Sequence, residues 1–420
     1  MEVTIERILP GGLGLAHADG KTVMVALAAP GDRLRVHIVR EKGSVSFASI
    51  VEIIEPSTQR IEPPCPYFGR CGGCDFQQMN YQAQLDAKVE IVKDCLHRIA
   101  KIESLPEVQI TPAPHEWRYR ARAQWQIDID RKQLGYYESG SRQVCDVAEC
   151  AVLVPELQNQ LTRLRQEMAE DLLPTDARYF RAVVGDEGVA LSAGVRSPTV
   201  REDPLHNIQR TVANETYTLN AESFFQTNID LAPRLIDAAI GHASGETALE
   251  LYCGVGLFTV PLARRFKKVV GVEDNAEAAE FARRNLARAS LTNTEIATAD
   301  VARWLDLECG GRAQRRRRFG SVSRPAKASA SNPEIQSAVG ALQIDFLLLD
   351  PPCTGAESRV IDGILQIKPK QICYVSCDPA TLARDLRKII AGGYSLDSVA
   401  AFDMFPQTHH VETIAHLTGP

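Results

Sequence analysis

The chain has 420 residues, of which 45% are hydrophobic and 24% are charged, and its formal net charge is −6. This length allows roughly two to three domains with separate cores and excludes a single small module. No run approaches the roughly 18 apolar residues that a membrane span requires, and the first residues do not form a basic and then apolar leader. We therefore expect a cytoplasmic protein without a membrane segment.

Residues 1–56 alternate apolar and polar side chains in short runs, which are separated by turn sequences such as PGGLG and APGD. This pattern predicts a small antiparallel β-barrel. Barrels of this kind often bind RNA, but the acidic and basic residues of this segment balance. A purely structural role therefore stays open beside RNA binding.

A cysteine-rich loop follows the predicted barrel. The sequence CPYFGRCGGC places Cys65, Cys71 and Cys74 on a short, glycine-rich segment, where three thiolates can converge on one centre. Cysteines at such spacing in a reducing compartment more often bind metal than form disulfides. The fourth ligand would be Cys145 or Cys150. Four thiolates suit an iron–sulfur cluster, with zinc as the second choice because zinc ligands more often come in C-x-x-C pairs.

The predicted central domain, residues 57–220, mixes helical and strand-like segments. A helical pattern covers residues 81–99, and the segment WRYRARAQW at 117–125 alternates like a strand. Aromatic residues and arginines interleave in this segment: Trp117, Arg118, Tyr119, Arg120, Arg122 and Trp125. Such a strand either offers stacking planes and cations to RNA or buries its aromatic side chains in a core.

Strand and helix patterns alternate through the predicted third domain, residues 221–420. The apolar strand segments are 247–252, 267–273, 344–350 and 371–377, and the clearest amphipathic helical segments are 275–289 and 379–393. This alternation predicts an α/β fold with a parallel, doubly wound, Rossmann-like sheet. An insertion at about 307–340 carries a basic run at 312–318, which either attracts RNA or is dispensable.

The first strand of this sheet leads into the glycine-containing turn LYCGVG. Gly254 and Gly256 would let the backbone approach a ligand at the carboxyl end of the strand. The next strand ends at Glu273, where a carboxylate can hold ribose hydroxyls, and Asp300 follows the third strand. Because the turn lacks the third glycine of a dinucleotide-binding motif, the pattern favours S-adenosylmethionine over NAD.

Two later strand ends carry candidate catalytic residues. Asp350 ends the fourth strand, and Cys377 ends the fifth, just before a helix whose N-terminus favours a thiolate. A thiol at this position suits methylation at C5 of a pyrimidine, since C5 becomes nucleophilic only after a nucleophile adds at C6. The C5 proton must then leave, and Glu412, close to His409 and His410, is the candidate base.

The order of these motifs resembles that of the RNA uracil-C5 methyltransferases, and in particular their bacterial iron–sulfur branch acting on 23S ribosomal RNA. The resemblance rests on a barrel similar to a TRAM domain, then CPYFGRCGGC, FFQTN, LYCGVG, SCDPATLARD and FPQTHHVET, and it covers nearly the whole chain. It implies methylation of a specific uridine in 23S ribosomal RNA through a covalent cysteine adduct. It also implies that RNA is the partner of a monomeric enzyme.

The resemblance further implies a role for individual residues. Cys377 would be the nucleophile and Glu412 the base. A [4Fe–4S] cluster would be held by Cys65, Cys71, Cys74 and Cys150. The S-adenosylmethionine site would be lined by Gln226, Tyr252, Glu273, Asp300 and Asp350, in addition to the turn at Gly254.

The chain departs from the usual family pattern at Leu257, Cys353, Asp378 and His409. Because DPPC followed by YVSC resembles the paired cysteines of RNA cytosine-C5 methyltransferases, one alternative is an enzyme that uses Cys353 and Cys377 on cytosine. A second alternative is a uridine-C5 methyltransferase that acts on transfer RNA. A third is a non-catalytic RNA-binding protein whose cluster is structural or redox-sensing.

Overall fold

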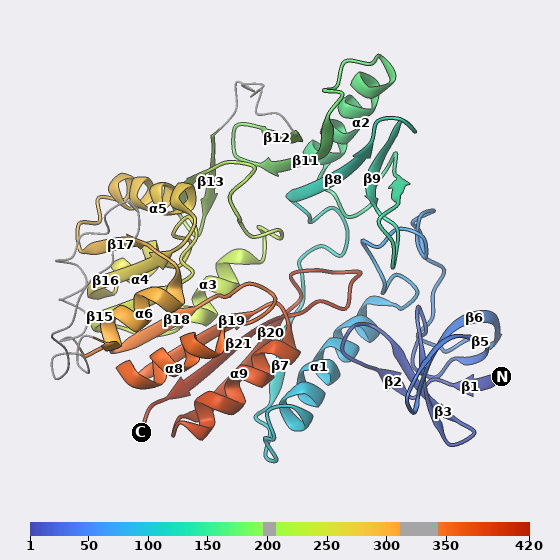
Figure 1. Cartoon of the computed structure of the whole chain (residues 1–420), viewed down its shortest axis with the longest axis horizontal. Helices are drawn as coiled ribbons and strands as arrows, with labels where there is room; N and C mark the ends of the chain where they lie inside the picture. The colour runs from blue at the N-terminus through green and yellow to red at the C-terminus, as the bar shows by residue number, and fades with distance from the viewer. Residues whose placement is uncertain (196–206, 311–342) are drawn as a thin grey trace, which may run out of the picture.

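The computed structural model describes residues 1–195, 207–310 and 343–420 (Figure 1). The chain forms an N-terminal sheet, a central antiparallel sheet and a large mixed sheet that is covered by helices on both faces. The predicted basic run at 312–318 lies outside the described residues. Within the described ranges, no helix is long and apolar enough to cross a membrane.

The N-terminal sheet contains six strands in the order β1-β5-β6-β4-β3-β2. Its strands are β1 (Glu2–Thr4), β2 (Arg7–Ile8), β3 (Gly14–Ala18), β4 (Lys21–Val25), β5 (Arg33–Lys42) and β6 (Val45–Glu55). Alternate residues such as Leu34 and Val36 are buried, as the sequence pattern predicts. The prediction of purely antiparallel pairing is wrong at one position, because β4 and β6 run parallel.

The central sheet is antiparallel, with the strand order β10-β9-β8-β11-β12. It is formed by β8 (Arg122–Asp128), β9 (Gln133–Tyr137), β10 (Val144–Asp146), β11 (Ala177–Val184) and β12 (Val189–Val195), and α2 (Pro155–Ala169) packs against it. Trp125 and Tyr119 are buried in the core. Of the two alternatives for this segment, the structure therefore excludes RNA stacking by these two rings.

The third sheet has eight strands in the order β17-β16-β15-β18-β19-β21-β20-β7. Its strands are β7 (Val108–Thr111), β15 (Gly245–Leu251), β16 (Phe266–Glu273), β17 (Thr294–Thr298), β18 (Phe346–Leu349), β19 (Gln371–Ser376), β20 (Ser395–Phe402) and β21 (Glu412–Thr418). The predicted parallel pairing is confirmed from β17 to β19. The sequence did not predict that β21 runs antiparallel to both of its neighbours.

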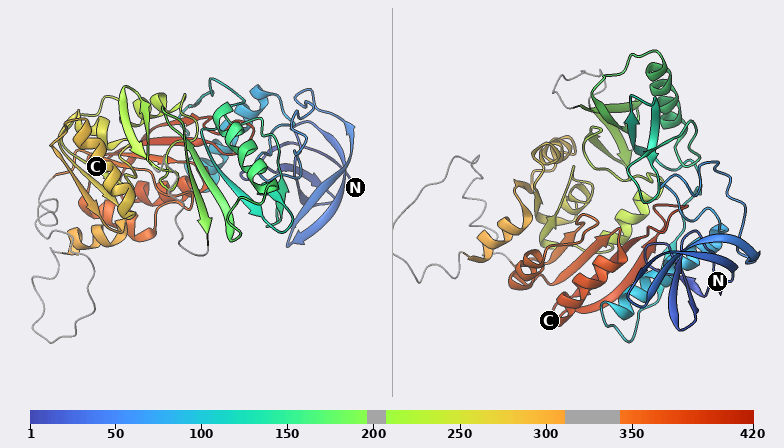
Figure 2. Two further views of the ribbon diagram at one scale, coloured as in Figure 1. Left: turned by 90° about the horizontal axis from the view of Figure 1, so that it is seen from above. Right: turned by 45° about the vertical axis from the view of Figure 1, so that its right-hand side comes forward.

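Helices cover both faces of this sheet (Figures 1 and 2). One face packs against α3 (Ala232–Ile240), α4 (Thr259–Ala263) and α5 (Ala276–Arg288). The opposite face packs against α1 (Tyr81–Arg98), α6 (Val301–Gly310), α8 (Ser358–Ile367) and α9 (Pro379–Ala391). A separate two-stranded ribbon, β13 (Ile208–Val212) and β14 (Glu215–Leu219), precedes α3. Buried on both faces, the parallel strands are nearly continuous apolar runs.

Helix α1 joins the cysteine-rich segment to the large sheet. Asn80 caps its N-terminus, where its side chain accepts a hydrogen bond from Ala83 N at 3.0 Å. The helix contacts α9 and β7, so residues from the predicted central domain extend the large sheet and one of its helical layers. This packing places α1 beside the connection between β20 and β21, residues 403–411.

A fully buried ion pair fixes that connection to α1. The Lys88 ammonium contacts the Asp403 carboxylate, and neither side chain is exposed to solvent. Lys88 Nζ also donates to Phe405 O at 3.0 Å, and the Tyr81 hydroxyl donates to Asp403 Oδ2 at 2.7 Å. A buried charge is tolerated only with such partners, so this contact depends on both side chains.

We expect Lys88→Ala to lower the free energy of unfolding by about 3–5 kcal/mol, because Asp403 would keep a buried charge without its cation. Urea unfolding of the purified protein measures the loss. Replacing both partners, as Lys88→Met with Asp403→Leu, should cost less than Lys88→Ala alone. The pair Arg98–Asp94, whose arginine side chain is 63% exposed, provides the control, since Arg98→Ala should change stability by about 1 kcal/mol or less.

Candidate active site

The turn after β15 opens the site at the carboxyl edge of the parallel strands. Tyr252, Gly254 and Gly256 all have a positive φ, of 64°, 54° and 93°. A Cβ added at Gly254 would meet no atom within 4 Å, so this part of the turn faces open space. The turn therefore leaves room for a ligand to approach the backbone, as its sequence predicts.

Glu273 and Asp300 both lie at this edge, and each holds the local backbone. The Glu273 carboxylate accepts hydrogen bonds from Gly254 N at 2.8 Å and from Asn275 N at 2.9 Å. It thereby ties the end of β16 to the glycine turn. Asp300 Oδ1 accepts from Arg303 N at 2.8 Å at the start of α6. These carboxylates consequently stand at fixed positions around the open turn.

Two further carboxyl groups are buried near this edge. Burial raises the pKa of Asp350, at the end of β18, to about 7, and the nearby Cys353 adds to the shift. Burial likewise raises the pKa of Glu250 to about 8, and Thr259 Oγ1 donates to its carboxylate at 2.5 Å. Glu250 was not among the predicted site residues, although an acidic residue inside the apolar run TALEL was a usable signal. Such a cluster favours a ligand that carries positive charge.

Cys377 and Glu412 come together at the same edge. Strand β21 pairs antiparallel with β19, with Ser376 opposite Thr413, so the residue after β19 and the first residue of β21 share one end of the sheet. Glu412 is buried, and its pKa is raised well above the ordinary range by burial and by the nearby Asp350 and Cys353. The structure thus brings the predicted nucleophile and base together with Asp350.

A second thiol lies beside Cys377. The side chains of Cys353 and Cys377 hydrogen-bond to each other, at the carboxyl ends of the neighbouring strands β18 and β19. This hydrogen bond lowers the pKa of Cys353 to about 6 and raises that of Cys377, which is also less exposed and faces the Glu412 carboxylate. Of the two thiols, the exposed Cys353 is therefore the one that ionises more easily.

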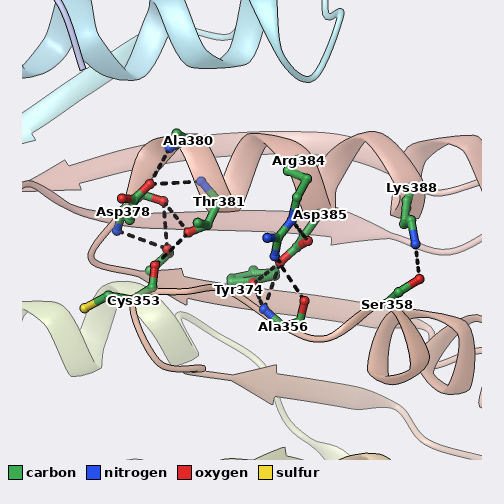
Figure 3. Close-up of polar contacts among 11 residues, drawn as sticks. Cys353, Ala356, Ser358, Tyr374, Asp378, Ala380, Thr381, Arg384, Asp385 and Lys388 are labelled. Atoms are coloured by element: carbon green, nitrogen blue, oxygen red, sulfur yellow. Dashed lines mark hydrogen bonds and ion pairs between the residues drawn. The ribbon is translucent and has the colours of Figure 1, made fainter. Parts of the chain in front are cut away.

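The first turn of α9 holds the loop that carries Cys353 (Figure 3). Asp378, a departure from the family pattern, is the N-cap of α9, and its Oδ1 accepts from Ala380 N at 2.8 Å and Thr381 N at 2.9 Å. Thr381 Oγ1 donates to Cys353 O at 3.3 Å. The change from the common asparagine to aspartate preserves the cap of α9, since both residues are good N-caps.

Gln226 is buried in the connection between β14 and α3. The next residue, Thr227, accepts a backbone hydrogen bond from Ala121 N at 2.9 Å, which joins this segment to the central sheet. Phe224, two residues before Gln226, is 61% exposed, and the Arg122 guanidinium lies 5.8 Å from the centre of its ring. The FFQTN segment therefore presents an exposed aromatic ring next to a buried amide.

The four predicted cluster ligands line one pocket. Its lining includes Cys65, Cys71, Cys74 and Cys150. Cys145, the alternative fourth ligand, does not line this pocket; it is buried and accepts a hydrogen bond from Arg70 Nε at 3.3 Å. In the described part of the chain, no three His, Cys, Asp or Glu side chains are arranged to hold a single metal ion. The geometry therefore favours Cys150 over Cys145 as the fourth sulfur.

Comparison with known proteins identifies the family. Residues 202–419 match the family model of tRNA (uracil-5-)-methyltransferases, and residues 1–58 match the TRAM domain of tRNA (uracil(54)-C(5))-methyltransferases. A 23S rRNA (uracil(1939)-C(5))-methyltransferase of Pectobacterium atrosepticum is 31% identical, over 100% of this chain and 94% of its own length. The chain belongs to the RNA uracil-5-methyltransferase family. The family that the motifs resemble is thereby confirmed.

Further proteins are similar to the chain in sequence or in fold. An uncharacterised RNA methyltransferase of Halalkalibacterium halodurans is 30% identical, over 99% of this chain and 96% of its own length. The crystal structure of Pyrococcus abyssi tRNA (uracil-54, C5)-methyltransferase, in complex with S-adenosyl-L-homocysteine, superposes with a TM-score of 0.72 at 25% identity and full coverage of both chains. The likeness confirms the α/β methyltransferase fold with an N-terminal TRAM domain.

We expect iodoacetamide to alkylate Cys353 with a pH midpoint near 6, because the hydrogen bond from Cys377 stabilises the Cys353 thiolate. Above that pH the thiolate is present, and below it the protonated thiol is unreactive. Cys377→Ala removes the donor, so the midpoint should rise toward about 8.5, the ordinary value of a free thiol. Mass spectrometry of the alkylated peptides across pH 5–9 measures both midpoints; equal midpoints would contradict the thiol pair.

Proposed function

We propose that this enzyme methylates C5 of a specific uridine in 23S ribosomal RNA, with S-adenosylmethionine as methyl donor and Cys377 as nucleophile. The observation that carries the proposal is the convergence of Cys377, Glu412 and Asp350 beside the open turn at Gly254. A nucleophile, a base and a ligand-accepting backbone are the parts that C5 methylation requires.

The proposed chemistry begins when the Cys377 sulfur bonds to C6 of the uracil and electron density moves onto C5. The exposed Cys353 thiolate is within hydrogen-bond reach to accept the Cys377 proton at this step. S-adenosylmethionine, when bound, supplies a sulfonium methyl group that C5 can attack. Glu412 then takes the C5 proton, the C5=C6 double bond re-forms, and the C6–S bond breaks to release Cys377.

Burial suits Glu412 to this task. A carboxylate with a raised pKa is a stronger base than one in water, which helps it to remove a proton from carbon. The acidic edge would also complement a sulfonium cation, whose charge would favour the ionised forms of the carboxyl groups around it. The proposed residues of this cofactor site are Gln226, Tyr252, Gly254, Glu273, Asp300 and Asp350. The S-adenosyl-L-homocysteine bound by the Pyrococcus abyssi relative supports this cofactor.

We propose that the cysteine pocket holds a [4Fe–4S] cluster. Around one zinc ion, tetrahedral bonds of about 2.3 Å bring the sulfur atoms to roughly 3.8 Å from each other. In a four-iron cluster each thiolate binds a different iron, so the sulfur ligands stand farther apart than around one ion. Cys65, Cys71, Cys74 and Cys150 line one pocket, and the described residues form no site for a single metal ion. Both observations support the cluster over zinc.

Arg120 gives independent support for an anionic group in this pocket. Its side chain lines the pocket, and its buried Nε has no hydrogen-bond partner among the described residues. A buried Nε–H without an acceptor is costly, and the negative charge of a thiolate-ligated cluster would compensate it. We propose that the cluster, when bound, mainly stabilises the fold of this loop.

The choice of ribosomal RNA rests on the full-length match to relatives named for 23S rRNA, at 31% identity for Pectobacterium atrosepticum and 29% for Vibrio parahaemolyticus. The structure neighbour named for tRNA is 25% identical. Family membership likewise favours uracil over cytosine, although Cys353 and Cys377 are in contact as the cytosine alternative requires.

We expect wild-type protein with S-adenosylmethionine to form a covalent adduct with a 23S rRNA transcript that contains 5-fluorouridine, because fluorine cannot leave C5 as a proton does. The adduct should be visible as a shifted band on a denaturing gel. Cys377→Ala should give none, and Glu412→Gln should still give it. A transfer RNA transcript with the same base should react at least tenfold more slowly, within the usual span of site discrimination.

Three outcomes would contradict these assignments. An adduct with Cys377→Ala would remove the nucleophile assignment, and faster reaction with transfer RNA would replace the proposed substrate. The third concerns Cys353→Ala with ordinary RNA. In the cytosine alternative this variant would accumulate adduct because release fails, whereas we expect it to release the methylated product.

We expect Cys150→Ala to lose bound iron and its broad absorbance near 400 nm, since one of four cluster ligands is removed. Cys145→Ser, at a buried cysteine outside the pocket, is the matched control and should keep both signals. Iron and sulfide analysis of anaerobically purified protein measures the difference. Loss of iron in Cys145→Ser with retention in Cys150→Ala would reverse the assignment.

A further inference from the structure

Asp75 links the cysteine loop to the connection that carries the proposed base. It follows Cys74 directly in the sequence, while His409 precedes Glu412 by three positions. Asp75 Oδ1 accepts from His409 N at 2.8 Å, and Asp75 Oδ2 lies 2.5 Å from His409 Nδ1. A single carboxylate therefore holds both the backbone and the ring of His409.

The backbone around Asp75 strengthens this link. The amides of Asp75 and Phe76 donate to Gln407 O at 3.1 and 3.0 Å. Gln407 is buried, has a φ of 70°, and is held from the other side by Gln84 of α1, whose Oε1 accepts from Gln407 N at 3.0 Å. A left-handed conformation in a residue other than glycine persists only where its surroundings fix it.

The N-terminal sheet closes over the same contact. A Cβ added at Gly12 would lie 2.8 Å from Asp75 Oδ2 and 3.1 Å from the Cβ of His409. The glycine, with a φ of 78°, thus allows the β2–β3 turn to approach the pair closely. Three separate parts of the chain meet here: the N-terminal turn, the cysteine loop and the connection at residues 403–411.

We propose that Asp75 is a positioning residue, which holds His409 and thereby sets the place of Glu412 relative to Cys377. The inference rests on the proposed function, because it assumes that Glu412 is the base. Asp75 itself touches no reacting atom. Its effect on Glu412 is indirect: Asp75 holds His409, and Glu412 follows His409 by three positions in the same segment. Through this contact the order of the cysteine loop would affect proton removal by Glu412 and not the attack by Cys377.

The residue that Asp75 holds, His409, departs from the usual family pattern. His409 stands where the family motif commonly has glycine, so the ring that Asp75 holds is a departure from the pattern. The adjacent rings of His409 and His410 have their centroids 4.2 Å apart, and His409 also contacts the ring of Phe76 edge-on. The His409 ring therefore contacts the Asp75 carboxylate as well as two neighbouring rings.

We expect Asp75→Ala to lower kcat by about 10- to 100-fold with little change in KM for RNA, because a small displacement of a catalytic group has effects of this size. The rate of adduct formation with 5-fluorouridine RNA should stay normal, while the covalent intermediate with ordinary RNA should accumulate. Asp75→Asn keeps an acceptor for His409 N and should restore most of kcat. His409→Ala, which keeps that amide, should have a smaller effect than Asp75→Ala.

Hydrogen exchange gives a readout that is independent of turnover. In Asp75→Ala, peptides covering residues 405–412 should exchange faster, peptides covering Cys377 should not change, and the iron content should stay normal. Cys74→Ala should reproduce the faster exchange, and Cys145→Ser should not. Unchanged kcat in Asp75→Ala, or an equal loss in adduct formation and turnover, would overturn the role of Asp75. Failure of the wild-type protein to form any adduct would instead overturn the proposed function.

Discussion

The antiparallel insertion of β21 between β19 and β20 is the constraint on which the active site depends. Parallel strands deliver only their carboxyl ends to one edge of a sheet, so they can bring Cys377, Asp350 and the turn at Gly254 together. Strand β21 runs the other way, and its first residue, Glu412, therefore reaches the edge at which β19 ends. One strand pairing thus brings the proposed nucleophile and the proposed base together, although 35 positions separate them in the sequence.

Electrostatics give this edge its chemical character. Burial raises the pKa values of Asp350, Glu250 and Glu412, and the thiol pair shares a proton whose position favours charge on Cys353. An arrangement of this kind holds acidic groups in readiness for a cationic ligand and for proton transfer. In the sequence, Cys353 suggested cytosine as an alternative substrate base. As a hydrogen-bond partner of Cys377, it is also compatible with a uracil methyltransferase.

The connection at residues 403–411 is held by elements that lie far from it in the sequence. Lys88 and Tyr81 of α1 bind Asp403, Gln84 binds Gln407, and Asp75 binds His409. The N-terminal turn packs over the last of these contacts. A connection without regular structure is kept in one conformation by such surrounding contacts, and both the cysteine loop and the N-terminal sheet contribute to them.

The sequence by itself determined the elements and most of the candidate residues, because periodicity, caps and glycine turns are local signals. It identified the helices at 81–98, 276–288 and 379–391 to within a few residues, and it placed Cys377 at a strand end. The tertiary structure alone decided the direction of β21, the addition of β7 to the large sheet, the burial of Tyr119 and Trp125, and the contact between Cys353 and Cys377. Each of these depends on contacts between residues distant in the chain, whose pairing no local pattern specifies.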